Sequence, residues 1–528
     1  MVSTVSVLTS DPAVTGWAPW RRPVFVAVAS ILAGVATALV FVLRAGDAGE
    51  SNWPANWELR SSDNGVLFQL LQDVAAGRPL EWNFSPQVYV FPELPISALA
   101  YLGAEGNVYW YYLLVAAINN ALLFAALYLV VRLLDRSLDV TSHLLRATVA
   151  FLPLLILPLL GTAWLLSYHL APTYYFGMYL VLLGAPALWL SRSWAARAAL
   201  AVAIVLTAAS NPLVLVFAVP ALVIVGVLVW LREGFGAVRG GALALGAVLV
   251  AALLVRLLAF SGLQGTSPLA YVDVGLFIGR LDALWPYLAW LLSDPTTRVV
   301  LVTGAVAAVA CFAGAVVAAV LFWRRRERKL LVAVWYGLVP VTGLAGTVVL
   351  LITHQLYLWP VLVAPLVFLL LAVPVRWGRW FVGVAILLAG VLVVGTGSFG
   401  TQDRFFGFRS VETRCLDERL PAGAEIGYAT FSDARRLSLT SERGVRLIPL
   451  KSDGEQAGWL ANLDYLHADV GRFFYLNDAG DERMIDNDFI VATFGEPDAV
   501  YPCDDSRYIW LYSSPEKLAA IAEHYGVR

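Results

Sequence analysis

Long apolar runs, separated by short polar or basic connections, fill most of the first four hundred positions of the chain. Runs such as 24–43 and 299–323 are as long as the roughly 20 apolar residues that cross a bilayer core of about 30 Å. Because the bilayer core offers no water to bond a free backbone, such segments must be helical. The pattern therefore predicts an all-α polytopic membrane bundle of about eleven spans. Their expected ranges are 24–43, 108–131, 147–166, 174–190, 197–210, 213–231, 240–260, 299–322, 330–353, 356–373 and 380–398.

A polar, aromatic-rich loop, residues 45–107, interrupts this pattern directly after the first span. Within it, apolar residues recur at helical spacing, and Gly77 stands where such a helix should stop. These apolar residues are Val66, Leu67, Leu70, Leu71 and Val74, of which all but Val66 share one face. A helix of this kind is expected to lie on the membrane interface, with Ser62 or Asp63 as its N-cap. Residues 91–102 look similar, so the loop is predicted to hold two interfacial helices.

The character of the chain changes after residue 398, which divides it into a membrane domain, 1–398, and a C-terminal domain, 399–528. In the second domain, apolar and polar residues alternate over 444–450 and 488–493, which is typical of strands. The stretch from Pro515 to Tyr525 has helical spacing. The C-terminal domain is therefore predicted to be a small α/β domain outside the membrane.

The composition agrees with a membrane protein. Of the 528 residues, 59% are hydrophobic and only 14% are charged, whereas about a quarter are charged in soluble domains. The net charge of -2 hides an asymmetry, because residues 399–528 hold 22 Asp and Glu against 14 Lys and Arg. Nucleic acid is disfavoured as a partner, since phosphate binding needs a concentrated basic surface and the one soluble-looking part is acidic.

The positions of Lys and Arg in the short loops predict which side each loop faces. Six groups fall on one side, which is therefore expected to be the cytoplasm together with the N-terminus. They are Arg21 and Arg22; Arg132, Arg136 and Arg146; Arg192 and Arg197; Arg232 and Arg239; Arg324, Arg325, Arg326, Arg328 and Lys329; and Arg376 and Arg379. The opposite side receives the loop 45–107, the turns near 168–173 and 354, the loop 260–298 and the C-terminal domain. Abundant Ala, Val, Leu and Arg with little Lys is typical of a GC-rich bacterium, so the expected location is a bacterial plasma membrane, with the C-terminal domain extracytoplasmic.

Two cysteines, Cys415 and Cys503, stand near the ends of the C-terminal domain. If that domain is outside the cell, it occupies an oxidising compartment, and a disulfide between them is expected. Cys311 falls within a span and is expected to be inert packing.

Candidate chemistry gathers at the outer ends of the spans. Asp63 is a helix cap in one interpretation and a general base or a metal ligand in the other, and the two are compatible. The other candidates for substrate binding are Asn64, Asp73, Glu93, His169, Tyr174, Arg256, His354 and Tyr357. For the tyrosines and histidines the alternative is the aromatic belt at the membrane interface. For Arg256 the alternatives are a lipid phosphate and simple snorkelling to the interface.

Several chemistries are missing from the sequence. It has no glycine-rich phosphate loop, no zinc-type spacing of His and Cys, and no Gly-x-Ser-x-Gly motif. A nucleotide-dependent enzyme is therefore disfavoured.

In layout the chain resembles the GT-C superfamily, the multi-span glycosyltransferases that take sugar from a polyprenyl-phosphate donor. The resemblance rests on an N-terminal span, an external loop with an acidic residue near its start in Ser61-Ser62-Asp63-Asn64, two interface helices, a bundle of about eleven spans and an external C-terminal domain. The turn at 354–360 is also similar to the polar, proline-bearing outer turns found late in such bundles. Many members have an adjacent acidic pair where this chain has Asp63-Asn64, a departure that bears on metal dependence more than on general-base catalysis.

The resemblance implies transfer of a sugar to a glycan, lipid or protein acceptor of the cell envelope, with Asp63 as the base that deprotonates the acceptor hydroxyl. A divalent metal ion is possible as a cofactor, with Asp63 as its ligand.

Two alternatives stay open. One is a transporter or flippase for a lipid-linked or small substrate, although the span centres are almost free of charge. The other is a non-catalytic assembly or sensor protein, in which the C-terminal domain binds a partner.

Overall fold

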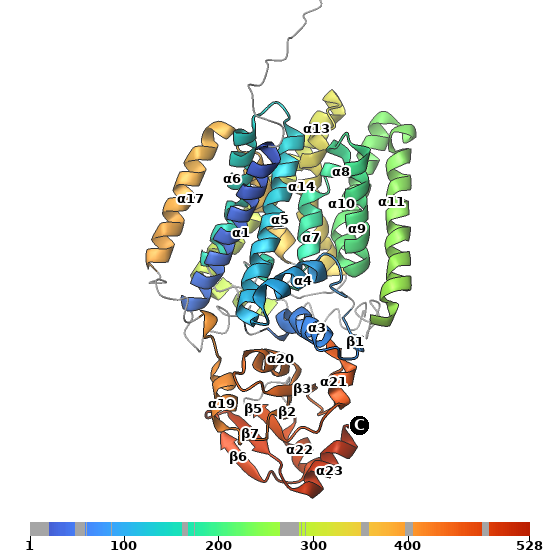
Figure 1. The fold of residues 1–528 in the computed structure, drawn as a ribbon. Helices are drawn as coiled ribbons and strands as arrows, with labels where there is room; N and C mark the ends of the chain where they lie inside the picture. Colours follow the sequence, from blue (N-terminus) through green and yellow to red (C-terminus); the bar gives the residue numbers. More distant parts are fainter. Residues whose placement is uncertain are drawn as a thin grey trace, which may run out of the picture.

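The computed structural model describes most of the chain as a helical bundle with a C-terminal α/β domain attached to one face (Figure 1). The residues described are 21–47, 59, 61–85, 87–160, 167–173, 175–263, 285–286, 288–290, 292–349, 358–395, 405–477 and 485–527. A mostly helical chain with several apolar helices and a small C-terminal sheet agrees with the predicted fold class, whereas the domain boundary after residue 398 lies outside the described residues and stays a prediction.

Among the described residues, six helices are long and apolar enough to cross a membrane. They contain the segments Arg22–Leu43, Val108–Leu134, Val140–Leu159, Leu213–Glu233, Phe235–Phe260 and Thr297–Arg325. Four shorter apolar segments accompany them, Phe176–Leu190, Trp194–Ser210, Leu330–Gly346 and Trp359–Leu371. These helices indicate a multi-pass membrane protein, while the number of eleven spans stays a prediction.

In chain order the helices of the bundle are α1 (Arg21–Asp47), α5 (Val108–Leu134), α6 (Val140–Leu160), α7 (Phe176–Gly184), α8 (Ala187–Leu190), α9 (Trp194–Ser210), α10 (Leu213–Glu233), α11 (Phe235–Val255), α13 (Pro295–Arg325), α14 (Leu330–Val349), α15 (Trp359–Leu362), α16 (Ala364–Leu371) and α17 (Val375–Gly395). The C-terminal domain lies below one face of the bundle in Figure 1, which we call the domain face. The connections from α5 to α6, α10 to α11 and α13 to α14 lie at the opposite face. These connections include or adjoin basic residues that the sequence assigns to the cytoplasm. Cys311 of α13 is buried, as packing requires.

The first loop forms a 3-10 turn η2 (Ser62–Gly65), α3 (Val66–Ala75), a short strand β1 (Trp82–Asn83) and α4 (Glu93–Ala104). Helix α3 lies between the bundle and the C-terminal domain (Figure 1), so it does not rest on the membrane surface alone as its amphipathic pattern predicts. Its buried side is also wider than predicted, with Val66, Leu67, Phe68 and Leu70 buried and Val74 exposed. Gly77 follows α3 with a φ of 65°, which favours glycine, at the predicted end of the helix.

The expected N-cap at Ser62 or Asp63 is not formed. The N-cap of η2 is Ser61 and that of α3 is Gly65, and neither of these residues forms a side-chain capping bond. The backbone N–H of Val66 donates to the carbonyl of Asp63, so a main-chain acceptor takes the place of a capping side chain.

The C-terminal domain contains α19 (Val411–Arg419), β2 (Ile426–Thr430), α20 (Phe431–Thr440), β3 (Arg446–Leu450), β4 (Ala461–Asn462), α21 (Leu463–His467), β5 (Phe473–Asn477), α22 (Asn487–Phe494), β6 (Ala499–Pro502), β7 (Arg507–Leu511) and α23 (Pro515–His524). Its five-stranded sheet has the order β3-β2-β5-β7-β6. Strand β2 is parallel to β3 and β5, and β7 is antiparallel to β5 and β6.

One strand expected in this domain is wrong, since 488–493 belongs to helix α22. Local signals at both ends outweigh the alternation of apolar residues. The side chain of Asp486 accepts from the N–H of Asp488 at the start, and Gly495 with a φ of 76° ends the helix.

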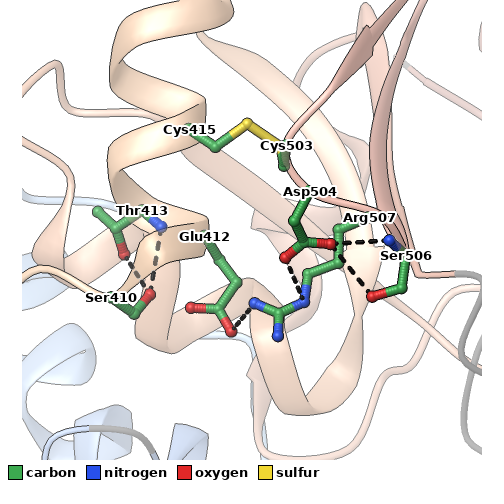
Figure 2. The surroundings of a disulfide bond; sticks show 8 residues. All are labelled: Ser410, Glu412, Thr413, Cys415, Cys503, Asp504, Ser506 and Arg507. Carbon is green, nitrogen blue, oxygen red and sulfur yellow. Dashed lines mark hydrogen bonds and ion pairs between the residues drawn. A yellow bond between two sulfur atoms is a disulfide. The ribbon is translucent and has the colours of Figure 1, made fainter. Parts of the chain in front are cut away.

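A disulfide joins α19 to the segment between β6 and β7 (Figure 2). It links Cys415 and Cys503, the pair expected from the sequence, whose Cα atoms are 5.4 Å apart. Beside it, Arg507 forms an ion pair with Glu412 at 2.5 Å (Figure 2). Burial alone would raise the pKa of Glu412, but the guanidinium groups of Arg436 and Arg507 outweigh it and lower that pKa to about 2.

Candidate functional site

Asp63 lies in the η2 turn, at the junction of the bundle with the C-terminal domain. Its neighbours Ser62 and Asn64 are buried, whereas Asp63 itself is half-buried. The hydroxyl of Thr173 donates to the carbonyl of Asp63 at 3.1 Å and lies 3.4 Å from Oδ1 of Asn64. Thr173 thus holds the turn at Asp63 and at Asn64. Of the polar side chains in the turn, that of Asp63 is the most exposed.

Thr173 ends a segment, 167–173, that contains the 3-10 helix η4 (Tyr168–Leu170) but no α-helix and that enters the bundle. Nδ2 of Asn120 in α5 donates to the carbonyl of His169 at 3.3 Å, and Nδ2 of Asn119 donates to the carbonyl of Ala171 at 3.2 Å. These asparagines lie roughly 17 Å along α5 from its start, at 1.5 Å per residue. Irregular backbone at that depth persists only where protein or a polar cavity surrounds it.

His169 is therefore not in a shallow outer turn, as the aromatic-belt interpretation expects. It is fully buried, and its Nε2 lies 2.8 Å from the carbonyl of Leu154. Because a carbonyl only accepts, that ring nitrogen carries a proton. The structure gives His169 a role in anchoring the segment within the bundle.

Glu93 begins α4 and is 2% exposed. Its Oε1 accepts from the backbone N–H of Gly177 at 2.9 Å, so it satisfies a donor in the first turn of α7. A Cβ at position 177 would lie 2.4 Å from Cδ of Pro92, so this close approach needs glycine. Oε2 of Glu93 is buried without a hydrogen-bond partner among the described residues. Burial is the main reason that the pKa of Glu93 is raised to about 7.

The Asp63 turn and Glu93 contact the same short piece of chain. Thr173 bonds the turn and Gly177 bonds Glu93, and these residues are four apart in sequence. Four residues span at most about 14 Å when fully extended. Asp63 and Glu93, two of the acidic residues of the first loop, therefore lie near the same short piece of chain at the domain face.

Helix α9 ends beside the same region. The N–H of Phe91 donates to Oγ of Ser210 at 3.1 Å, and the N–H of Val88 donates to the Ser210 carbonyl at 3.0 Å. Nη1 of Arg256 donates to the carbonyl of the preceding residue, Ala209, at 2.8 Å. Arg256 is half-buried. It bonds Ala209, and the next residue, Ser210, bonds the segment that leads to Glu93.

Asp73 faces away from this region and joins the first loop to the C-terminal domain. It is 1% exposed, Oδ2 accepts from Nδ2 of Asn462 at 3.0 Å, and Oδ1 pairs with Arg78 at 3.2 Å. Strand β1 continues this junction by pairing with β4, with Trp82 opposite Asn462. These contacts tie the first loop to the C-terminal domain, and a part of Asp73 in substrate binding stays a prediction.

Three of the predicted binding residues, Tyr174, His354 and Tyr357, lie outside the described residues. Within the described ranges, no group of three or more His, Cys, Asp and Glu side chains could hold a metal ion. We therefore derive no step through a metal.

The structure adds residues that the sequence did not single out. Asn119 and Asn120 had a visible signal, since two adjacent amides interrupt an apolar span and such residues deserve a functional hypothesis. No such signal marked Thr173, Ser210 and Arg435, because their partners lie far away in the sequence. Thr173 and Asp63 are 110 residues apart, and Arg435 and Ser62 are 373 residues apart.

No protein-family model, curated protein or solved structure matches the chain. The apolar helices define it as a multi-pass membrane protein with a small α/β domain. What it does must be inferred from the site.

Proposed function

We propose that this chain is an integral-membrane glycosyltransferase of the GT-C type. It would transfer a sugar from a polyprenyl-phosphate donor to a glycan, lipid or protein acceptor at the extracytoplasmic face of a bacterial plasma membrane. The observation that carries the proposal is the half-buried Asp63, held on a fixed turn where the bundle meets a water-exposed domain. A carboxylate at such a junction would suit a lipid-borne donor together with an acceptor from the water phase.

In the proposed reaction Asp63 is the general base. The acceptor hydroxyl oxygen attacks the anomeric carbon, and its proton passes to the carboxylate of Asp63. The bond between the anomeric carbon and the phosphate oxygen breaks, and its electron pair leaves with the polyprenyl phosphate. No water or nucleotide is consumed, which suits the absence of nucleotide-binding motifs.

The leaving phosphate needs positive or hydrogen-bonding groups around it. Arg256 is the candidate cation, since a guanidinium matches phosphate oxygens and this one stands beside α9 and the first loop. Glu93 is buried and would support the site indirectly, by bonding the backbone N–H of Gly177; burial raises its pKa to about 7. Asn64 and the segment around Thr173 would shape the sugar site. If the reaction uses a divalent ion, Asp63 is the residue of the turn that would hold it.

A transporter or flippase is the second candidate, and one observation favours it. The irregular segment 167–173, bonded to Asn119 and Asn120 in α5, resembles the interrupted helices at which transporters bind their substrates.

Sealed proteoliposomes distinguish the two functions. The purified protein is given undecaprenyl-phosphate donors carrying different radiolabelled sugars, with an envelope extract as acceptor and with either Mg²⁺ or EDTA. A glycosyltransferase releases undecaprenyl phosphate and moves the label to the acceptor. A flippase moves the donor across the bilayer with its sugar still attached, and that result would overturn the proposal.

A further inference from the structure

Arg435 belongs to the C-terminal domain but bonds to the first loop of the membrane domain. Its side chain, on α20, is 6% exposed. Nη1 donates to the carbonyl of Ser62 at 2.9 Å, and Nε donates to Oε1 of Gln69 in α3 at 2.9 Å. Nη2 donates to the carbonyl of Leu460 within its own domain. The guanidinium thus clamps the residue directly before Asp63 to the start of α3.

Close packing of α20 on η2 leaves this clamp little freedom. The hydroxyl of Ser62 donates to the carbonyl of Ser432, in the first turn of α20, at 2.6 Å. A Cβ on Gly65 would lie 2.3 Å from Cδ1 of Leu439 and 3.0 Å from Cδ of Arg435. In Figure 1, α20 is the part of the C-terminal domain that faces α3.

The charge of Arg435 acts on the same turn. All three of its hydrogen bonds end on neutral oxygens, so none of them neutralises the guanidinium. Burial lowers the pKa of Arg435 to about 10, and the charge of Asp63 is the largest influence in the opposite direction. The group therefore stays protonated at neutral pH and attracts the carboxylate of Asp63.

We propose that Arg435 is a positioning residue for Asp63, which makes the C-terminal domain a working part of the transferase site and more than an appended binding module. The inference rests on the proposed function of Asp63 as the base. By holding the carbonyl of Ser62, Arg435 fixes the backbone that carries the carboxylate, and its charge orients that carboxylate. Loss of such a support affects the rate more than donor affinity, because misplacing a reacting group by about 1 Å can lower the rate about 10²-fold.

Four variants separate positioning from general docking. Arg435→Ala removes the clamp. Arg435→Lys keeps the charge, but a single ammonium cannot reproduce a planar fork that reaches three acceptors. Asn462→Ala weakens the junction at its other end, where Asn462 bonds Asp73 and the carbonyl of Pro79. Arg419→Ala removes an exposed arginine of the same domain and is the matched control.

The first readout is turnover of the undecaprenyl-phosphate sugar that the wild type prefers. Arg435→Ala is expected to lower kcat about 10²-fold with little change in the donor KM, and Arg435→Lys is expected to recover part of the loss. Asn462→Ala and Arg419→Ala should stay close to the wild type in kcat. An unchanged kcat in Arg435→Ala, or an equal loss in Asn462→Ala, would overturn the positioning role and leave the proposed function intact.

The second readout needs no substrate. Amide hydrogen exchange of residues 61–75 is measured in the same proteins, with the β5 and β7 amides as a report on the folding of the C-terminal domain. Faster exchange in η2 with an unchanged sheet is expected for Arg435→Ala, whereas Asn462→Ala should speed exchange only near Asp73. If the wild type consumes no donor but this change is seen, the proposed function fails and the clamp stands. If exchange is unchanged in Arg435→Ala, the clamp itself is refuted.

Discussion

Replacing Glu93 by glutamine should change how the stability of the protein depends on pH. The pKa of Glu93 is raised from 4.5 to about 7, mainly by burial, so the folded protein binds this proton more tightly than the unfolded chain does. Stability therefore falls as pH rises through the window from 4.5 to 7, because the buried group becomes charged. A pKa shift of this size lowers the free energy of unfolding by about 3 kcal/mol, at 1.36 kcal/mol per pKa unit. This loss of stability is complete only above pH 7.

Glutamine keeps the acceptor for the N–H of Gly177 but carries no charge at any pH. The stability of Glu93→Gln relative to the wild type should consequently rise by about 3 kcal/mol between pH 5 and pH 8. The test is this change with pH. The stability of Glu93→Gln at any single pH is not informative, because the amide N–H groups of the glutamine need hydrogen-bond partners of their own. With an unfolding entropy of about 2.1 cal/mol/K per residue, this change moves the difference in thermal midpoint by about 3 °C.

Thermal midpoints in detergent at pH 5, 6, 7 and 8 measure the difference, and Glu105→Gln, at an exposed position of the same loop, is the control. Infrared difference spectra give an independent check, through a protonated-carboxyl band that titrates with a midpoint near 7 in the wild type and is missing in Glu93→Gln. A difference in midpoint that stays constant from pH 5 to pH 8 would refute the burial argument.

Three further predictions concern the C-terminal domain and its junction with the bundle. Replacing both Cys415 and Cys503 by alanine opens a loop with a sequence separation of 88 and should destabilise the domain by about 4–5 kcal/mol in the chain-entropy account, measured as a lower denaturation midpoint of this domain; a midpoint unchanged by reducing agent in the wild type would contradict it. Asn462→Ala leaves the buried carboxylate of Asp73 short of one donor and should cost about 1–3 kcal/mol, seen as faster proteolysis between the bundle and the domain; equal protease sensitivity would argue against the bond. Gly65→Ala forces α20 away from η2 and should cost about 1–3 kcal/mol, with faster hydrogen exchange in η2; wild-type exchange there would mean that the junction yields without strain.

The apolar runs predict that most of the chain forms apolar helices, because a bilayer span imposes both a length and a helical backbone on the sequence, whereas the count of eleven spans stays a prediction. Gly77 and the helix over 515–525 were also predictable from local signals, and the structure places them accordingly. The sequence failed where two local signals competed. At 488–493 the cap at Asp486 and the stop at Gly495 outweigh the alternation.

The candidate site was predictable only in part. Asp63 could be selected from its position after the first span and the tryptophans around it, but its proximity to Glu93 depends on contacts with Thr173 and Gly177. Contacts at such separations leave no periodic trace in a sequence. The role of Arg435 is the clearest case, since nothing near it in the chain indicates that it bonds Ser62.

The same contact changes how a deletion of the C-terminal domain should be interpreted. From the sequence, loss of all function on deletion would indicate a binding scaffold, whereas an enzyme would lose only acceptor choice. Because α20 packs on the Asp63 turn, an enzyme should also lose its activity when the domain is removed. Point variants are therefore more informative than the deletion.

The central claim is that Asp63 is the base of a sugar transfer, and the most direct test compares turnover of the preferred polyprenyl-phosphate sugar by the wild type and by Asp63→Asn. Both proteins must first show the same thermal midpoint, and Glu105→Gln serves as a control for loss of a carboxylate in the same loop. The account predicts a loss in kcat of about 10²–10⁴-fold for Asp63→Asn, the usual contribution of a general base. Full activity of a correctly folded Asp63→Asn protein would contradict it.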